Sequence, residues 1–356
     1  MDKWSYTARE LQHKHMPSER HTAQLDVIFQ NLKVKQYMEK STIEIRNDIR
    51  FFTLFALLNG PFEYREEYGS NMTKERIELI DELTAISCTL DDKYIKTLKA
   101  YWESKKLHPW WYVYYTAQIK IQEKFTFESC SSNKDFDEIL EMMNGFEKLL
   151  QEFYVRYSIQ EMYNKKYRYI IDQYIATYNL QKIIDDRNGV HEYLGIEKIK
   201  KSPEIIIVPL PFESQFSGYC VVTDEEIYIL ESKGAQNEGL NIHEYLHFFV
   251  NSTVDMIDDL YKLPIANEYK KNREKEYVRT SYDELYCFIS ENIVRAIEHR
   301  ISNHKRIHII DFNEFNKNGL SLIEYFYNRL EDYENEETKY QDIYEFIDDA
   351  IRSFQI

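Results

Sequence analysis

Glycine and proline are scarce in this sequence. The chain has 356 residues, of which 9 are glycine and 7 are proline. An average globular protein uses roughly 7% glycine and 5% proline, which is more than twice the combined share found here. Because a β-sandwich needs turn residues about every 8–12 positions, this shortage argues against an all-β protein and favours long helices with few tight turns.

Cysteine pairs and long apolar runs are also missing. The four cysteines lie far apart, at positions 88, 130, 220 and 287. This spacing argues against a disulfide scaffold and against a cysteine zinc site. No run of about 18 apolar residues predicts a membrane span. The first residues lack the basic and then apolar pattern of a secretion signal, so we expect a cytoplasmic protein, although a trimmed chain would lack that signal too.

Basic charge is in deficit. The sequence has 61 acidic and 45 basic side chains, which gives a formal net charge of −16. Such a chain repels a phosphate backbone, because binding to nucleic acid depends mainly on lysine and arginine contacts to phosphates. We therefore expect no nucleic-acid partner.

The pattern of apolar residues changes along the chain. Residues 1–20 are polar and are predicted to form a flexible N-terminus, and residues 21–195 are predicted to form a helical N-terminal region. Within that region, the apolar positions from 136 to 157 recur at spacings of three and four, which is typical of one helix. Another helix is predicted to end at Asn59-Gly60-Pro61, because glycine and proline stop it.

Residues 196–356 are predicted to form the catalytic region. Short β-branched runs predict strands over 204–208, 218–223 and 226–231, of which the last two form a hairpin. Helices are then predicted from residue 240 and over 281–302, 319–333 and 338–354. The expected fold class is α+β: mostly helical, with a small mixed or antiparallel sheet packed on the helix that begins near residue 240.

One motif points to chemistry. His243-Glu244-Tyr245-Leu246-His247 is an HExxH sequence. On a helix, the two histidines lie on one face and one turn apart, so both imidazoles can bind one Zn²⁺. Glu244 then lies beside the metal, where it can take a proton from metal-bound water.

A helix with two hydrogen-bonded core histidines and no metal is the alternative interpretation. The flanks Leu240–Ile242 and Phe248–Val250 are uncharged and mostly apolar. A buried helix of this kind suits a metal site, and two histidines with a glutamate are costly to bury without one.

A catalytic zinc site needs a third protein ligand. The residues after His247 do not continue as in HExxHxxGxxH, so a third histidine at that spacing is excluded. The predicted helix over 281–302 offers two carboxylates seven residues apart on one face, Glu284 and Glu291. We favour Glu291 as the ligand, with Glu284 as the second choice and Arg295 available to pair with the carboxylate.

The HExxH helix and a downstream glutamate resemble the gluzincin metallopeptidases, whose ligands are two histidines and one glutamate. The chain is also similar to an uncharacterised bacterial domain family with an HEFSH-type motif. That likeness is patchy but extends from about residue 40 to residue 350, and Tyr245 and Leu246 replace the more usual Phe-Ser. The similar segments are 57–64, 107–109, Tyr219, 243–251 and 291–296.

The resemblance implies a zinc-dependent metallopeptidase, a hydrolase that cleaves a peptide or protein substrate. Its Zn²⁺ would be bound by His243, His247 and Glu291, and Glu244 would be the catalytic base. The resemblance also implies that the strand over 226–231 is an edge strand along the cleft, where an extended peptide pairs with it. The alternative is a catalytically inactive zincin-like protein that binds peptides or regulates a partner.

Two further sets of residues complete the prediction. No spacing selects the group that stabilises the oxyanion, and the candidates are Tyr277, Tyr282, Tyr286 and His299. The remaining histidines show no metal-binding spacing and are interpreted as surface residues: His13, His15, His21, His191, His304 and His308.

Overall fold

The structure is a computed structural model. It describes residues 43–64, 72–105, 107–121, 127–129, 139–195, 204–213, 218–223, 226–233, 240–282, 284–304, 310–335 and 339–355. The predicted class is confirmed, because the chain is mostly helical with a small mixed sheet of four strands. The predicted flexible N-terminus, 1–20, lies outside the described residues.

The described residues form two compact units. The first contains those within Ser41–Tyr178 and Pro203–Glu238, and the second contains those within Asn179–Ser202 and Gly239–Ile356. The strands therefore group with the N-terminal helices, whereas the sequence analysis grouped them with residues 196–356. The sheet and the HExxH helix belong to different units.

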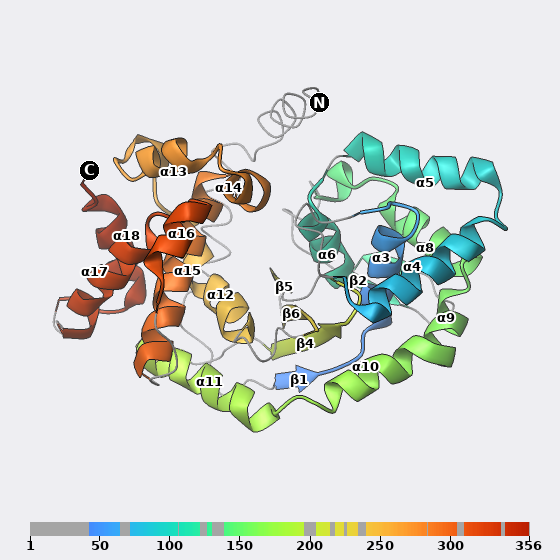
Figure 1. Ribbon diagram of the computed structural model, residues 1–356, viewed down its shortest axis with the longest axis horizontal. Coiled ribbons are helices and arrows are strands. Elements are labelled where there is room, and N and C mark those ends of the chain that lie inside the picture. Colours follow the sequence, from blue (N-terminus) through green and yellow to red (C-terminus); the bar gives the residue numbers. More distant parts are fainter. Residues whose placement is uncertain are drawn as a thin grey trace. The chain divides into compact units, whose positions relative to one another are not determined.

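The main sheet of the first unit has the strand order β1-β4-β6-β5 (Figure 1). These strands are β1 (Ile43–Ile45), β4 (Glu204–Leu210), β5 (Gly218–Val222) and β6 (Glu226–Ser232). The strand β4 is parallel to both β1 and β6, and β5 is antiparallel to β6, which confirms the predicted hairpin. Nearly every residue of β4 and β6 is buried, as expected for parallel strands with both faces covered.

The prediction that 226–231 is an edge strand is wrong. The strand β6 lies between β4 and β5, so both of its edges are already hydrogen-bonded. One edge of the sheet is instead β5, where the Trp110 indole donates to the Cys220 carbonyl oxygen at 3.0 Å. The expectation came from the resemblance, and the sequence pattern does not correct it, because a buried strand with two neighbours and a half-buried edge strand can share the same short apolar pattern.

The core of the first unit is built around α3 (Ile49–Asn59), whose residues from Phe51 to Asn59 are all buried. The Asp48 carboxylate accepts a hydrogen bond from the Arg50 backbone N–H at the start of this helix. The helix ends before Gly60, as predicted; a Cβ atom there would lie 2.9 Å from the Ala56 carbonyl oxygen. The other elements are α4 (Lys74–Ser87), α5 (Asp92–Lys105), α6 (Pro109–Ala117), β2 (Ile119–Ile121), β3 (Phe127–Ser129), α8 (Phe146–Arg156), α9 (Ile159–Met162), η1 (Tyr163–Tyr167) and α10 (Arg168–Ile175).

The single helix predicted over 136–157 is wrong. Gly145 has a φ of 87° and α8 begins only at Phe146, so the apolar stripe is interrupted by a left-handed residue. Residues 136–138 lie outside the described residues. The short strands β1, β2 and β3 also fall in the region predicted to be helical, because three residues are too few to show a period of two.

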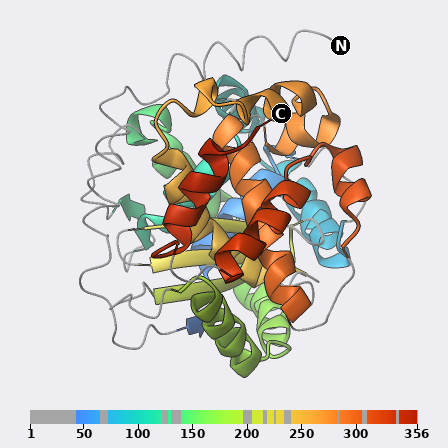
Figure 2. The same ribbon diagram turned by 90° about the vertical axis from the view of Figure 1, so that its left-hand side faces the viewer.

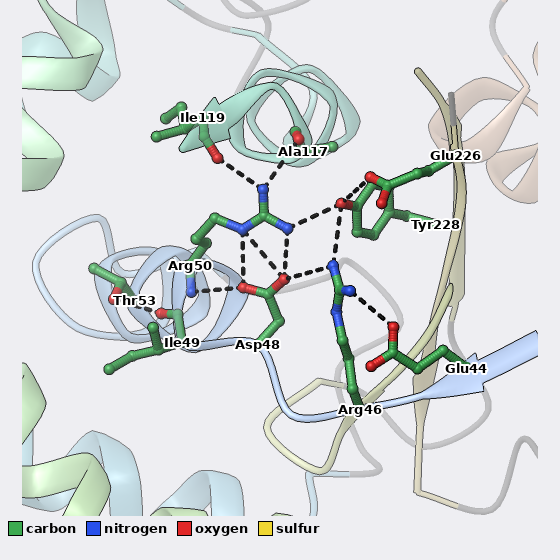
Figure 3. Close-up of polar contacts among 10 residues, drawn as sticks. All are labelled: Glu44, Arg46, Asp48, Ile49, Arg50, Thr53, Ala117, Ile119, Glu226 and Tyr228. Carbon is green, nitrogen blue, oxygen red and sulfur yellow. Dashed lines mark hydrogen bonds and ion pairs between the residues drawn. The ribbon is translucent and has the colours of Figure 1, made fainter. Parts of the chain in front are cut away.

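A network of charged side chains surrounds the start of α3 (Figure 3). The Arg50 guanidinium donates to the Asp48 carboxylate, to the Tyr228 hydroxyl at 3.0 Å, and to the carbonyl oxygens of Ala117 and Ile119 at 3.2 and 2.7 Å. Although burial by itself lowers the pKa of Arg50, Asp48 outweighs it and raises the pKa. The network joins α3, the end of α6, β2 and β6.

The second unit contains helices and no strand among its described residues. Its elements are α11 (Leu180–Tyr193), α12 (Leu240–Asp255), η3 (Leu260–Lys262), α13 (Ala266–Asn272), α14 (Glu276–Ser281), α15 (Leu285–His304), α16 (Phe312–Asn318), α17 (Ile323–Asn335) and α18 (Ile343–Arg352). The helix α12 packs against α11, α15 and α18 (Figures 1 and 2). The predicted helices over 281–302, 319–333 and 338–354 correspond to α15, α17 and α18. No helix in the described ranges is long and apolar enough to span a membrane.

Candidate metal centre

Two packed helices position the candidate ligands. The helix α12 buries Leu246, Val250 and Val254, which follow one another at intervals of four residues. His243 and His247 are one turn apart on the same helix, and α15 contributes Glu291. Among the described residues, these three form the only group of histidine, cysteine and acidic side chains with the geometry to hold a metal ion.

The three inward-facing ligand atoms form a nearly regular triangle. The Nε2 atoms of His243 and His247 are 3.2 Å apart, and the Oε2 atom of Glu291 lies 3.5 and 3.4 Å from them. Tetrahedral zinc with bonds of about 2.0–2.1 Å separates its ligand atoms by about 3.3–3.4 Å. The spacing of the side chains therefore fits a single tetrahedral ion with three protein ligands and one open position.

The electrostatics of the group also suit a cation. Burial by itself lowers the pKa of His243, but Glu291 and Glu298 outweigh it and raise the pKa to about 10. Burial raises the pKa of Glu291, but Arg295 and His243 outweigh it and hold the pKa well below its usual range. Without a metal, the carboxylates of Glu291 and Glu298 therefore favour the protonated form of His243.

The outer nitrogen of each histidine is held by a polar side chain. The His243 Nδ1 atom donates to the Glu298 carboxylate at 3.1 Å, and the His247 Nδ1 atom donates to the Asn251 side-chain oxygen at 3.1 Å. When Nδ1 carries the proton, the Nε2 lone pair points to the metal, and such partners orient metal-binding histidines generally. The sequence analysis missed both partners. Glu298 is seven residues after Glu291 and Asn251 is four residues after His247, so helix spacing was an available signal.

The structure distinguishes the two candidate third ligands. Glu291 is 2% exposed and faces both histidines. Its Oε1 atom accepts a hydrogen bond from Arg295 Nε at 2.5 Å, so the arginine pairs with the carboxylate as expected. Glu284 instead accepts a hydrogen bond from the Tyr261 hydroxyl at 3.2 Å and is not part of the metal group.

Glu244 lies beside the first ligand on α12 and is 9% exposed. Burial raises its pKa above the usual range, although His247 and His243 oppose this effect. A buried carboxyl group of this kind can exchange a proton with a nearby donor or acceptor more readily near neutral pH than an exposed one.

The predicted oxyanion candidates lie in different surroundings. The Tyr277 and Tyr282 hydroxyls are 3.2 Å apart, and Arg295 Nη2 donates to the Tyr277 oxygen at 3.4 Å. Burial and the charge of Glu291 raise the pKa of Tyr282 well above its usual value. The His299 ring packs against Phe315. The neighbouring Cys287 and burial raise the pKa of Tyr286 well above its usual value. Tyr277 and Tyr282 are therefore linked to the metal group through Arg295.

The interpretation of His191 as a surface residue is wrong. Its Nε2 atom is hydrogen-bonded to the Tyr245 hydroxyl at 2.6 Å, and this contact joins α11 to α12. Burial and then the charge of Arg187 lower the pKa of His191 to about 4, so the ring is neutral. Four other histidines lie outside the described residues: His13, His15, His21 and His308. The side chain of His304 is not described either.

Comparisons of the chain with protein-family models, curated proteins and solved structures found no match. The assignment of a function therefore depends on the motif and on the geometry of the centre.

Proposed function

We propose that this protein is a zinc-dependent metallopeptidase of the gluzincin type. The observation that carries the proposal is the triangle of His243 Nε2, His247 Nε2 and Glu291 Oε2, whose sides of 3.2–3.5 Å match a tetrahedral ion. A carboxylate and two imidazoles with an open fourth position are the donor set of catalytic zinc in peptidases.

The donor set also bears on the identity of the metal. Magnesium and calcium prefer six or more oxygen ligands, so two imidazole nitrogens argue against both ions. Two histidines and one carboxylate also bind Fe(II) in some oxygenases, so the metal itself has to be identified.

A bound zinc ion would act as a Lewis acid and lower the pKa of its water to about 7. His243 and His247 hold their Nε2 atoms in place through Glu298 and Asn251. Glu244 accepts the proton of the attacking water and passes it to the leaving amine. Among the oxyanion candidates, Tyr277 and Tyr282 are the two connected to the metal group, through Arg295, and we assign the stabilisation of the oxyanion to one of them.

The test combines metal analysis with the Glu244→Gln variant. We expect about one zinc per chain in both wild type and variant, because Glu244 is not a ligand. Hydrolysis of a peptide library by the variant should fall by about 10²- to 10⁴-fold. Glu314→Gln, at an exposed position of α16, is the matched control and should keep full activity. Undiminished hydrolysis by Glu244→Gln would refute the proposal.

The inactive alternative is separated by the same experiment. A zincin-like binding or regulatory protein would contain zinc but cleave no peptide in a broad library, even with added metal. Protein that contains iron and no zinc after purification without added metal would contradict both interpretations.

A further inference from the structure

The two carboxylate oxygens of Glu291 have different partners. Oε2 faces the Nε2 atoms of both histidines, at 3.4 and 3.5 Å. Oε1 accepts the hydrogen bond from Arg295 Nε at 2.5 Å. Arg295 lies one helical turn after Glu291 on α15, so the pair is built into a single rigid helix.

Two other helices hold the Arg295 guanidinium in place. Its Nη2 atom donates to the Tyr277 hydroxyl, on α14, at 3.4 Å. Its central carbon lies 5.7 Å from the centre of the Phe315 ring, on α16, within the range of a cation–π contact. The arginine is therefore fixed by contacts that do not depend on a metal ion.

We infer that Arg295 is a positioning residue that makes Glu291 a one-oxygen ligand of the metal. A carboxylate can bind a metal through one oxygen or through two, and the Arg295 hydrogen bond occupies the second oxygen of Glu291. His243, His247 and Glu291 would then supply one donor atom each and leave an open position, which is the arrangement that a catalytic site needs. This inference rests on the metal centre of the proposed function, but not on peptide hydrolysis.

The coordination number of bound Co²⁺ tests the inference. Co²⁺ replaces zinc in sites of this type, and its visible absorption is strong when it is four-coordinate and much weaker when it is five- or six-coordinate. We expect a strong spectrum for the wild type. Arg295→Met frees Oε1 to bind the metal as well, so its spectrum should be severalfold weaker at the same metal content.

Two further variants serve as controls. Arg295→Lys keeps a donor near Oε1 and should restore most of the wild-type intensity. Arg300→Met breaks a comparable pair on the same helix, in which Arg300 Nε donates to Glu334 at 2.7 Å, and should leave the Co²⁺ spectrum unchanged.

The outcomes separate this inference from the proposed function. Wild type that binds no metal overturns the proposed function. If Arg295→Met binds Co²⁺ with the same spectrum as the wild type, only the role of Arg295 is overturned. The same holds if the spectrum of the wild type is already weak. If Arg295→Met does not fold, Arg295→Ala takes its place, because it also removes every donor to Oε1 of Glu291. An unchanged spectrum in that variant contradicts the inference equally.

Discussion

The two compact units each bury a group of charged side chains, and the two groups are arranged in opposite ways. In the first unit, the donors of Arg50 each face an acceptor: the Asp48 carboxylate, two backbone carbonyl oxygens and the Tyr228 hydroxyl (Figure 3). In the second unit, three atoms with lone pairs, on His243, His247 and Glu291, converge on one point.

This difference separates a structural charge group from a metal centre. Buried charges are stable when donors and acceptors are matched, as around Arg50. Converging lone pairs repel one another unless a cation lies between them, so the second arrangement needs either a proton or a metal ion. Burial alone does not make the distinction, because Asp48 and Glu291 both have side chains less than 10% exposed.

Removal of a metal ligand should have the largest effect on the second group, because it should abolish zinc binding. His247→Ala takes away one corner of the triangle, and we expect the zinc content to fall from about one per chain to nearly none after dialysis against a weak chelator. Elemental analysis measures this directly. His191→Gln is the matched control, because His191 is bonded to Tyr245 and not to the metal group, and it should retain zinc. Full zinc content in His247→Ala would mean that the metal is bound elsewhere.

A mutation in the charged group around Arg50 should lower the stability of the fold and leave zinc binding unchanged. Arg50→Met removes the nearest partner of the buried Asp48 carboxylate and leaves it only Arg46, at 3.8 Å, as a basic partner. Breaking a buried pair costs about 3–5 kcal/mol. Urea unfolding should show this loss in the free energy of unfolding, while the folded fraction keeps its zinc. The exposed pair Arg168–Asp172 provides the control, since Arg168→Met should cost less than about 1 kcal/mol. Loss of zinc in folded Arg50→Met would show that the two groups are coupled.

Much of the candidate site could be predicted from sequence, because HExxH and the carboxylate face of α15 are properties of single helices. Glu291 was favoured over Glu284, but spacing alone does not decide between the two, since residues seven apart on a helix point in nearly the same direction. Their environments depend on where α15 crosses α12 and on Tyr261, which contacts Glu284. Glu298 lies on the same face of α15 as Glu291. It was missed because its contact with His243 depends on where α15 crosses α12.

The fold shows a similar limit. The end of α3 before Gly60 was predictable, because glycine and proline stop a helix, and the structure adds that a side chain at Gly60 would meet the Ala56 carbonyl oxygen. The position of β6 in the middle of the sheet was not predictable. The pattern of residues within a strand does not indicate which other strands lie beside it. The break at Gly145 inside a regular apolar stripe was also missed, since a left-handed glycine leaves the spacing intact.

The side chains that accept hydrogen bonds from the histidines should have a smaller effect on zinc binding than the ligands themselves. Glu298→Gln replaces the carboxylate that accepts from His243 with a neutral amide. We expect zinc affinity to fall by about 10- to 100-fold, as for other partners of metal-binding histidines. Competition with a chromophoric chelator measures this change. Glu284→Gln, at the residue just before α15, should leave the affinity unchanged, and equal losses in the two variants would point to a general effect of charge.

The smallest effect concerns the proton that the metal replaces. In the metal-free protein, Glu291 and Glu298 overcome the effect of burial and raise the pKa of His243 to about 10, so this imidazole is protonated at neutral pH. Zinc binds only the neutral ring and must release that proton. Apparent affinity should therefore rise about tenfold, or about 1.4 kcal/mol, for each pH unit between about pH 7.5 and 9.

Calorimetry in two buffers with different ionisation enthalpies should count about one proton released per zinc bound. The sign of the linkage gives a second check. A raised pKa stabilises the metal-free fold below the unfolded value of about 6.5, and this contribution disappears as the pH rises through about 10. Addition of zinc should remove that pH dependence, because the metal then takes the place of the proton. Zinc binding without proton release would show that the lone pairs of this group do not share a proton, and the contrast with Arg50 would then lose its basis.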